Sequence, residues 1–445
     1  MERIRSSSSA ALSRVLPKDA NVPAVETPAT YRILDIGTVP AFIGSLPEIR
    51  ALLGGPPEQW QVQEVGDGNL NLIFIVQGPV GSVCVKQALP YVRAAGASWP
   101  MTLERAFFEA SYYAAVAPWV GGLIPRIYHY DRELYCTVME RLSPHIILRQ
   151  GLIAGRRYPN AARDAGEYIA RASFFTSDLA RPFEHKMDGM ALFARNQALV
   201  RITVELVFCD PYRVSERNRH TSPQLDQIVA ELRGDSRLKV AAAHYGQKFL
   251  TDTQALVHGD LHSGSVMVTE SDTRVIDPEF AFYGPIGFDL GAFLGNLLLS
   301  WYSQPGHATR EDSRRAYQQW ILEQAAVFWE SFRRNFLALW AENAHGDVLP
   351  VSMFARAEEA STLEAARAAF VDGLFADMLG FAACKMIRRI AGFAHVIDFD
   401  RIGDAVVRAG CEASALAMAR SLLIEPAQFR SIQDVLDAVP RMVRH

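Results

Sequence analysis

Cysteine is scarce in this chain of 445 residues. The five cysteines, Cys84, Cys136, Cys209, Cys384 and Cys411, are odd in number, widely separated and never spaced as CxxC. This pattern disfavours both a disulfide framework and a zinc site. It is typical of a protein that works in a reducing compartment, and we expect a cytoplasmic location.

The chain also lacks a basic excess and a long hydrophobic run. Lys and Arg number 45 against 49 for Asp and Glu, a net charge of −4, which disfavours a nucleic-acid partner and fits small substrates. The most apolar stretch, residues 286–301, contains Asp289 and Asn296, so it predicts a buried helix and no membrane partner. Hydrophobic residues make up 49% and charged residues 21%, which indicates an ordinary globular protein of two to three folding units.

The first 30 residues differ from the rest of the chain. They hold four consecutive serines and the basic residues Arg3, Arg5 and Arg14, with little hydrophobic character. An organelle-targeting segment is one interpretation, but Glu2 and Asp19 count against it. We expect a disordered tail over residues 1–30.

The region from residue 61 to residue 141 has the periodicity of strands around one helix. Residues 61–65 and 82–86 alternate between apolar and polar, residues 70–76 are almost entirely apolar, and residues 134–139 resemble a further strand. Between them, a helical pattern follows Thr102 and ends at Pro118. These features predict a small sheet that carries one helix.

Beyond residue 144 the periodicity is helical. Three short β-type runs, 255–258, 265–268 and 274–277, interrupt it, and such strands commonly present functional loops. The sequence therefore predicts an α+β protein with a β-rich unit (31–140), a mainly helical unit (141–425) and a C-terminal tail (426–445). The segments with helical spacing are 161–179, 223–250, 310–339, 355–389 and 402–423.

The most informative motif is His258-Gly-Asp-Leu-His262, followed by Asp277-Pro-Glu279. Phosphoryl transfer needs a carboxylate that orients the attacking hydroxyl, and Asp260 follows a predicted strand as that role requires. Asp277 and Glu279 flank Pro278, and side chains two residues apart on an extended backbone point the same way. Both carboxylates can therefore hold Mg²⁺.

A His-Gly-Asp tripeptide alone carries little information. The chain contains a second copy at residues 345–347, without a following strand or an acidic pair, and we give that copy no role. The strand, the loop, the next strand and the acidic pair together distinguish the first copy. His262 is expected to pack the loop, because no cluster of His and Cys completes a zinc site.

The predicted sheet carries a second group of candidate residues. A turn between two strands contains Gly66, Gly68 and Asn69, and glycine lets backbone amides approach phosphate oxygens. Lys86 lies on the next strand and Glu109 on the helix that follows. A Lys–Glu pair across the sheet orients the lysine toward nucleotide phosphates. Each signal is weak alone, since such turns often only connect hairpins and such lysines are often solvated.

The third group is Arg388-Arg389, in a segment that is otherwise apolar apart from Lys385. An apolar helix is buried, and buried guanidiniums need a partner or a polar cleft. One interpretation is a structural ion pair with Asp377 or Asp398. The other is a substrate pocket in which one arginine contacts the ligand.

The motifs together resemble the 5-methylthioribose kinases, within the protein-kinase-like phosphotransferases. The similar segments are 64–71, 85–93, 98–100, 258–262, 277–284, 287–289 and 385–392. The resemblance implies a bilobal kinase-like fold, ATP and Mg²⁺, phosphorylation of the anomeric hydroxyl of methylthioribose in methionine salvage, and a homodimer. It implies Asp260, Arg388 and Arg389 as catalytic and substrate-binding residues, and Asp277 and Glu279 as metal ligands. The implied ATP-binding residues are Gly66, Gly68, Asn69, Lys86, Glu109, Glu140, Arg141, Leu142, Asp277, Pro278 and Glu279.

Some positions separate the chain from other phosphotransferases. Aminoglycoside and choline kinases place Asn five residues after the catalytic Asp, where this chain has Ser265, a poorer metal ligand. Glu279 compensates for it. Arg141 stands where the family commonly has an acidic residue, so backbone groups of residues 140–142, and not the Arg141 side chain, are expected to bind adenine. The alternatives are a kinase of another small sugar or alcohol, or a catalytically dead nucleotide-binding pseudokinase.

Overall fold

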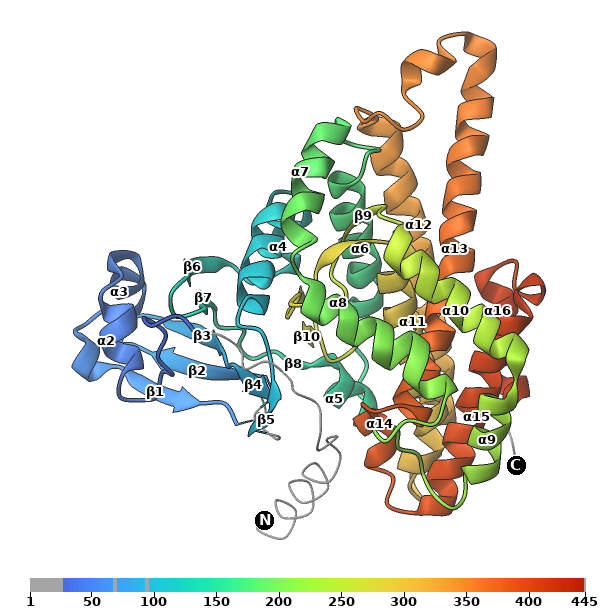
Figure 1. Ribbon diagram of the computed structural model, residues 1–445, viewed down its shortest axis with the longest axis horizontal. Helices are drawn as coiled ribbons and strands as arrows, with labels where there is room; N and C mark the ends of the chain where they lie inside the picture. The colour runs from blue at the N-terminus through green and yellow to red at the C-terminus, as the bar shows by residue number, and fades with distance from the viewer. Residues whose placement is uncertain (1–26, 67–69, 93–95, 444–445) are drawn as a thin grey trace. The chain divides into compact units, whose positions relative to one another are not determined.

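The computed structural model describes residues 27–66, 70–92 and 96–443, and these residues form two compact units (Figure 1). Unit 1 contains the described residues up to Ala114 together with Ile124–Pro144. Unit 2 contains Ala115–Leu123 and the described residues from His145 onward. The α+β composition predicted from the sequence, with a smaller β-rich part and a larger helical part, is confirmed.

Unit 1 is built on an antiparallel five-stranded sheet of order β1-β2-β3-β7-β6. Alternating residues of the central strands, among them Phe74, Val83 and Val138, face a core shared with α2 and α3. The helix α4 follows a hairpin formed by β4 and β5. The elements of this part of the chain are α2 (Val39–Gly44), α3 (Pro47–Leu53), η1 (Pro57–Gln59), β1 (Gln61–Glu64), β2 (Asn71–Gln77), β3 (Ser82–Ala88), β4 (Tyr91–Val92), β5 (Gly96–Pro100), α4 (Arg105–Val120), η2 (Gly121–Leu123), β6 (Ile127–Asp131) and β7 (Cys136–Glu140). The end of α4 and the whole of η2 belong to unit 2.

Two local predictions for this region were incomplete. The helix α4 continues through Pro118 to Val120, so the predicted end at the proline was wrong. The fixed φ of proline is helical, so the backbone keeps its helical course at Pro118 although that residue donates no backbone hydrogen bond. The sequence pattern also missed β4, which has two residues, and β5 and β6, in which glycine, proline or polar residues interrupt the apolar pattern.

Unit 2 is mainly helical, and its described residues include five short strands that form two small sheets. Its elements are β8 (Ile146–Ile147), α5 (Leu148–Ile153), α6 (Ala161–Thr176), α7 (Phe183–Phe193), α8 (Gln197–Thr203), the π-helical segment η3 (Val204–Cys209), η4 (Asp210–Tyr212), α9 (Asp226–Gly234), α10 (Ser236–Thr251), β9 (Ala255–Val257), β10 (Val266–Val268), β11 (Thr273–Val275), β12 (Phe282–Gly284), α11 (Ile286–Ser303), η5 (Gln304–His307), α12 (Arg315–Glu342), η6 (Val351–Phe354), η7 (Ala357–Glu359), α13 (Ala360–Ala391), α14 (Ile397–Asp400), α15 (Ala405–Ile424), η8 (Pro426–Gln428), α16 (Ile432–Ala438) and η9 (Val439–Met442).

The helix α11 forms the centre of unit 2. All 18 of its residues are buried, and it packs against α12, α13 and α15. Gly291 makes this packing possible, because a Cβ there would lie 2.6 Å from the backbone nitrogen of Ala382 on α13. The prediction of a buried helix over 286–301 is confirmed, and no helix of the described residues is long and apolar enough to span a bilayer.

The three predicted short strands are present as β9, β10 and β11. The strands β8, β10 and β11 pair antiparallel in one sheet, and β9 pairs with β12 in another. The loops that leave β9 and β11 therefore hold the His-Gly-Asp and Asp-Pro-Glu motifs.

The prediction of one continuous helix over 223–250 was wrong at one point. It is divided into α9 and α10 at Asp235, whose side chain accepts hydrogen bonds from the backbone nitrogens of Arg237 and Leu238 and so starts a new helix.

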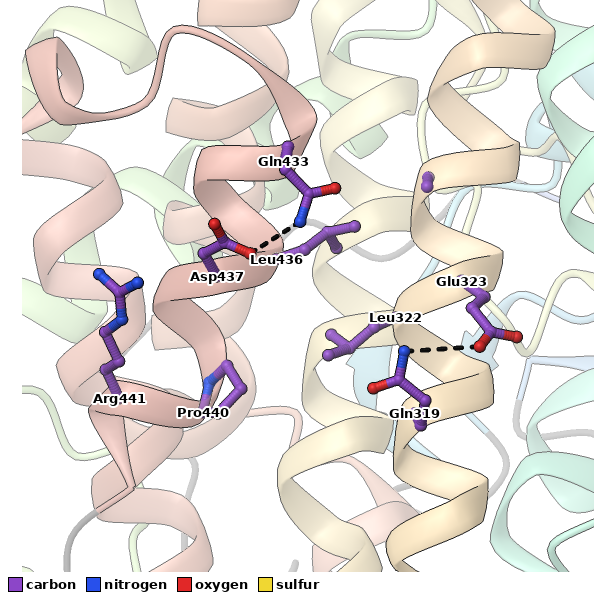
Figure 2. A pocket seen from close by; sticks show the side chains of 9 residues that line it. Gln319, Leu322, Glu323, Gln433, Leu436, Asp437, Pro440 and Arg441 are labelled. Carbon is purple, nitrogen blue, oxygen red and sulfur yellow. Dashed lines mark hydrogen bonds between the residues drawn. The ribbon is translucent and has the colours of Figure 1, made fainter.

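The segment expected to be a C-terminal tail contains α16 and η9. Val435 and Val439 are buried there, and α16 packs against α12. Figure 2 shows a cavity between these elements, in which Gln433 donates to Asp437 on one wall and Gln319 donates to Glu323 on the other. The side-chain amides of both glutamines therefore form hydrogen bonds within their own helices.

Candidate active site

In unit 1 the predicted Lys–Glu pair is formed. Lys86 lies inside β3, between Ile73 of β2 and Thr137 of β7, and its Nζ is 2.9 Å from Oε1 and 2.8 Å from Oε2 of Glu109 on α4. Both side chains are buried. The pairing fixes the ammonium group in the middle of the sheet, as nucleotide binding requires.

The glycine turn is only partly described. Gly66 is exposed, and a Cβ there would meet no atom within 4 Å, so its surroundings are open. Gly68 and Asn69 lie outside the described residues. The sequence did not single out Arg105, which is fully buried on α4 and donates to the backbone oxygens of Leu70 (2.6 Å) and Thr102 (2.5 Å). It anchors the chain directly after the turn.

The expected adenine-binding segment follows β7. The Oε2 of Glu140 accepts a hydrogen bond from the backbone nitrogen of Arg126 at 3.0 Å. Arg141 donates to Oε1 of Gln77 at 2.8 Å. Its side chain is thus bound along the sheet, whereas Leu142 is half-buried outside any regular element.

In unit 2 the backbone of the His-Gly-Asp loop is held by a carboxylate of α11. Asp289 accepts hydrogen bonds from the backbone nitrogens of His258 (2.6 Å) and Gly259 (3.0 Å). Gly259 has φ +82°, and a Cβ there would lie 2.2 Å from the carbonyl oxygen of Phe280. Only glycine fits this turn, which places Asp260 in the loop after β9.

Asp260 is bound on both oxygens. Nζ of Lys385, on α13, lies 2.8 Å from Oδ1, and Nε2 of His262 lies 3.4 Å from Oδ2. Burial raises the pKa of Asp260, but the charge of Lys385 and the contact with His262 hold that pKa well below its ordinary value. Asp260 is therefore a carboxylate that accepts hydrogen bonds. Sequence reasoning missed this use of Lys385.

The predicted loop-packing role of His262 agrees with its contacts. Its Nδ1 accepts from the backbone nitrogen of Gly264 at 3.0 Å, so the proton is assigned to Nε2, which faces Asp260. Burial lowers the pKa of His262 to about 3, and the ring is neutral. The hydroxyl of Ser265 donates to the backbone oxygen of Asp260 at 3.0 Å and so closes the loop.

The acidic pair lies close together, but not on an extended backbone. Asp277 has φ +71°, so the predicted extended geometry was wrong at this residue. A left-handed conformation is strained for aspartate and is common at functional sites. A carboxylate oxygen of exposed Asp277 nevertheless lies within 4.8 Å of one of buried Glu279. Pro278 between them is buried. Such an oxygen pair suits a magnesium ion.

Arg388 and Arg389 lie in the buried part of α13. Nε and Nη1 of Arg388 and Nε of Arg389 are buried without a hydrogen-bond partner among the described residues, while Nη1 of Arg389 donates to the backbone oxygen of Ala394. Burial lowers the pKa of both guanidiniums, and arginine still remains charged. Unsatisfied buried donors of this kind fit a ligand-binding role.

Of the two aspartates considered as structural partners of these arginines, Asp377 pairs elsewhere, whereas Asp398 faces both Arg149 and Arg389. Asp377 binds Lys248 at 3.1 Å, and Asp398 lies 3.5 Å from Nε of Arg149. Arg149 also donates to Ser263 in the loop after Asp260. Sequence reasoning missed Arg149, because it stands alone in a short helix more than 100 positions from its partners.

The comparisons with known proteins agree with these motifs. The phosphotransferase enzyme family (APH) matches residues 61–332. The chain is 44% identical over 412 residues to "Methylthioribose kinase" of Escherichia coli O45:K1, covering 92% of this chain and 98% of the relative. It is 45% identical over 410 residues to "Methylthioribose kinase 1" of Oryza sativa subsp. japonica, covering 91% of this chain and 94% of the relative. The chain therefore belongs to the methylthioribose kinases of the phosphotransferase enzyme family, and has their kinase-like fold class.

Proposed function

We propose that this chain transfers the γ-phosphoryl group of ATP to the anomeric hydroxyl of S-methyl-5-thio-D-ribose. The products are S-methyl-5-thio-α-D-ribose 1-phosphate and ADP, a step of L-methionine salvage. The similarity to methylthioribose kinases over more than nine-tenths of the chain supports this substrate most directly. The buried Lys86–Glu109 pair and the fixed carboxylate of Asp260 support the chemistry.

Asp260 accepts a hydrogen bond from the attacking hydroxyl and aligns its oxygen. A bond forms between that oxygen and the γ-phosphorus as the bond from phosphorus to the β,γ-bridging oxygen breaks and ADP leaves. The hydroxyl proton passes through the Asp260 carboxylate to solvent. Because the pKa of Asp260 is low, the carboxylate has little affinity for the proton, and its main contribution is to orient the attacking hydroxyl.

The other residues act on the phosphates. Lys86 binds the α- and β-phosphates while Glu109 holds its ammonium in place. Arg388 and Arg389 supply donors for the charge of the transferred group. Asp277 and Glu279 would hold Mg²⁺, which when bound neutralises phosphate charge. Gly66, Gly68, Asn69 and the backbone of residues 140–142 would complete the nucleotide site.

A substrate panel tests this proposal. The purified chain is incubated with ATP, Mg²⁺ and either methylthioribose, an aminoglycoside, choline or homoserine, and ADP release is followed. We expect kcat/KM for methylthioribose to exceed the others by at least about 10²-fold. ³¹P NMR then identifies the 1-phosphate. Equal values across the panel would favour a kinase of another small alcohol, and no turnover of any compound would favour the pseudokinase.

Location and assembly are part of the same proposal. All five cysteines are free thiols, which supports a reducing cytoplasm. The homodimer rests on the family resemblance, and light scattering of the purified chain tests it. A mass near the 49.4 kDa of one chain would contradict the dimer.

A further inference from the structure

Lys385 is a buried cation that the proposed function does not use. It lies on α13, and its side chain is only 4% exposed. A buried ammonium group is costly unless it is paired. The partner that it has is the proposed acceptor-orienting carboxylate, Asp260, at 2.8 Å.

The helix places Lys385 with the two arginines. Residues three and four positions apart share one face of a helix, so Lys385 lies on the side of α13 that carries Arg388 and Arg389. The ring of Phe288, on α11, lies 4.5 Å from Nζ and limits where the ammonium can move. The position of Nζ is thus fixed from two helices.

Lys385 and His262 lie beside different oxygens of the Asp260 carboxylate. Lys385 binds Oδ1, and Nε2 of neutral His262 faces Oδ2. The hydrogen bond from Lys385 holds Oδ1, and the imidazole beside Oδ2 restricts rotation of the carboxylate. A hydroxyl that binds Asp260 must then approach along the remaining lone pairs, in one narrow range of directions.

We propose that Lys385 is a positioning residue that keeps the Asp260 carboxylate ionised and oriented for the attacking hydroxyl. This proposal rests on the function proposed above for Asp260. The charged groups that face Lys385 are Asp260 from the loop after β9, Asp289 from α11, and Arg388 and Arg389 from α13 itself. His262, from the same loop as Asp260, faces Asp260. Arg149, from α5, faces Asp260.

The sign of the pH effect follows from this arrangement. Burial raises the pKa of Asp260 and the Lys385 charge lowers it, so removing the charge leaves the pKa higher. We expect the acid limb of the kcat profile to move to higher pH in Lys385→Met, whereas Lys385→Arg keeps the cation and retains the wild-type limb.

A double-mutant cycle tests whether Lys385 acts through Asp260. We expect Lys385→Met to lower kcat about 10²-fold with KM for ATP little changed. In the Asp260→Asn background the same change has no further effect on kcat beyond about threefold. Equal effects in both backgrounds, or an acid limb that does not move, would overturn the proposal. The substrate panel with the wild-type protein tests the proposed function separately.

Lys248→Met is the matched control. Lys248 pairs with Asp377 of the same helix α13, outside the candidate site. We expect its kcat and acid limb to match the wild-type protein. If Lys385→Met fails to fold, as judged by circular dichroism, Lys385→Arg is used for the test. This variant keeps the charge, so a folded Lys385→Arg protein that loses activity while its acid limb stays unchanged would contradict the proposal.

Discussion

The ammonium of Lys86 contacts both carboxylate oxygens of Glu109, at 2.9 and 2.8 Å, although 23 residues separate them. In Glu109→Gln this contact between charges becomes a weaker contact with an amide. We expect KM for ATP to rise at least about tenfold, because the ammonium loses its fixed position, and the free energy of unfolding to fall by about 3 kcal/mol. Steady-state kinetics and urea unfolding measure the two effects.

Glu133→Gln is the control for this variant, since Glu133 is exposed in the same unit. It should leave KM for ATP and stability unchanged. An unchanged KM in Glu109→Gln would mean that the pair has no part in nucleotide binding.

The backbone of the His-Gly-Asp loop gives a second prediction. In Gly259→Ala the new Cβ would lie 2.2 Å from the oxygen of Phe280 at a positive φ, so the loop must shift. We expect loss of at least about 2 kcal/mol of stability and of most activity. Gly234→Ala is the matched control, because a Cβ at that helical position meets nothing within 4 Å. Equal thermal unfolding of the two variants would contradict this account of the turn.

His262 makes the stability of the folded chain depend on pH. Burial lowers its pKa from 6.5 to about 3, so between these values the unfolded chain binds one proton more than the folded chain. The stability from neutral His262 is fully present above pH 6.5 and is lost as pH falls toward 3, by up to about 1.4 kcal/mol per pH unit. His262→Gln should make the measured slope shallower by this amount.

Urea unfolding at several pH values between 4 and 6.5 measures the slope. The exposed His185 offers a control, and His185→Gln should keep the wild-type slope. Parallel slopes for wild-type protein and His262→Gln would show that the ring is not held neutral.

The acidic pair leads to a prediction on magnesium. Asp277→Asn and Glu279→Gln each remove one anionic oxygen donor from a close pair. We expect the Mg²⁺ concentration for half-maximal activity to rise at least about tenfold in each variant. Glu270→Gln, a change of charge at an exposed position nearby, should leave it unchanged. A titration of activity with Mg²⁺ distinguishes these outcomes. If the curves of all three variants match the wild-type curve, Asp277 and Glu279 are not part of the metal site.

The sequence predicted the features that depend on local pattern. The strands β2 and β3 and the long helices α12, α13 and α15 follow from periodicity, and the Lys86–Glu109 pair follows from the order of elements. Contacts between segments that are distant in the sequence leave no periodic pattern by which they could be predicted. Lys385 lies 125 residues from Asp260 and stands in an apolar run, where nothing marks it as a partner of the loop.

The backbone of Asp277 shows another limit. A proline at the next position favours an extended residue before it, and the sequence pattern gave that expectation. The structure has φ +71° there instead. Local pattern alone therefore does not determine the backbone at this position.

The role of Asp260 is the central claim, and Asp260→Asn tests it most directly. The substitution keeps the size of the side chain but removes the charge that aligns the hydroxyl. Calorimetric titration with ATP and Mg²⁺, together with turnover of methylthioribose, should show a Kd for ATP within about threefold of the wild-type value and a kcat lower by about 10²–10⁴-fold. A kcat equal to that of the wild-type protein would contradict the account.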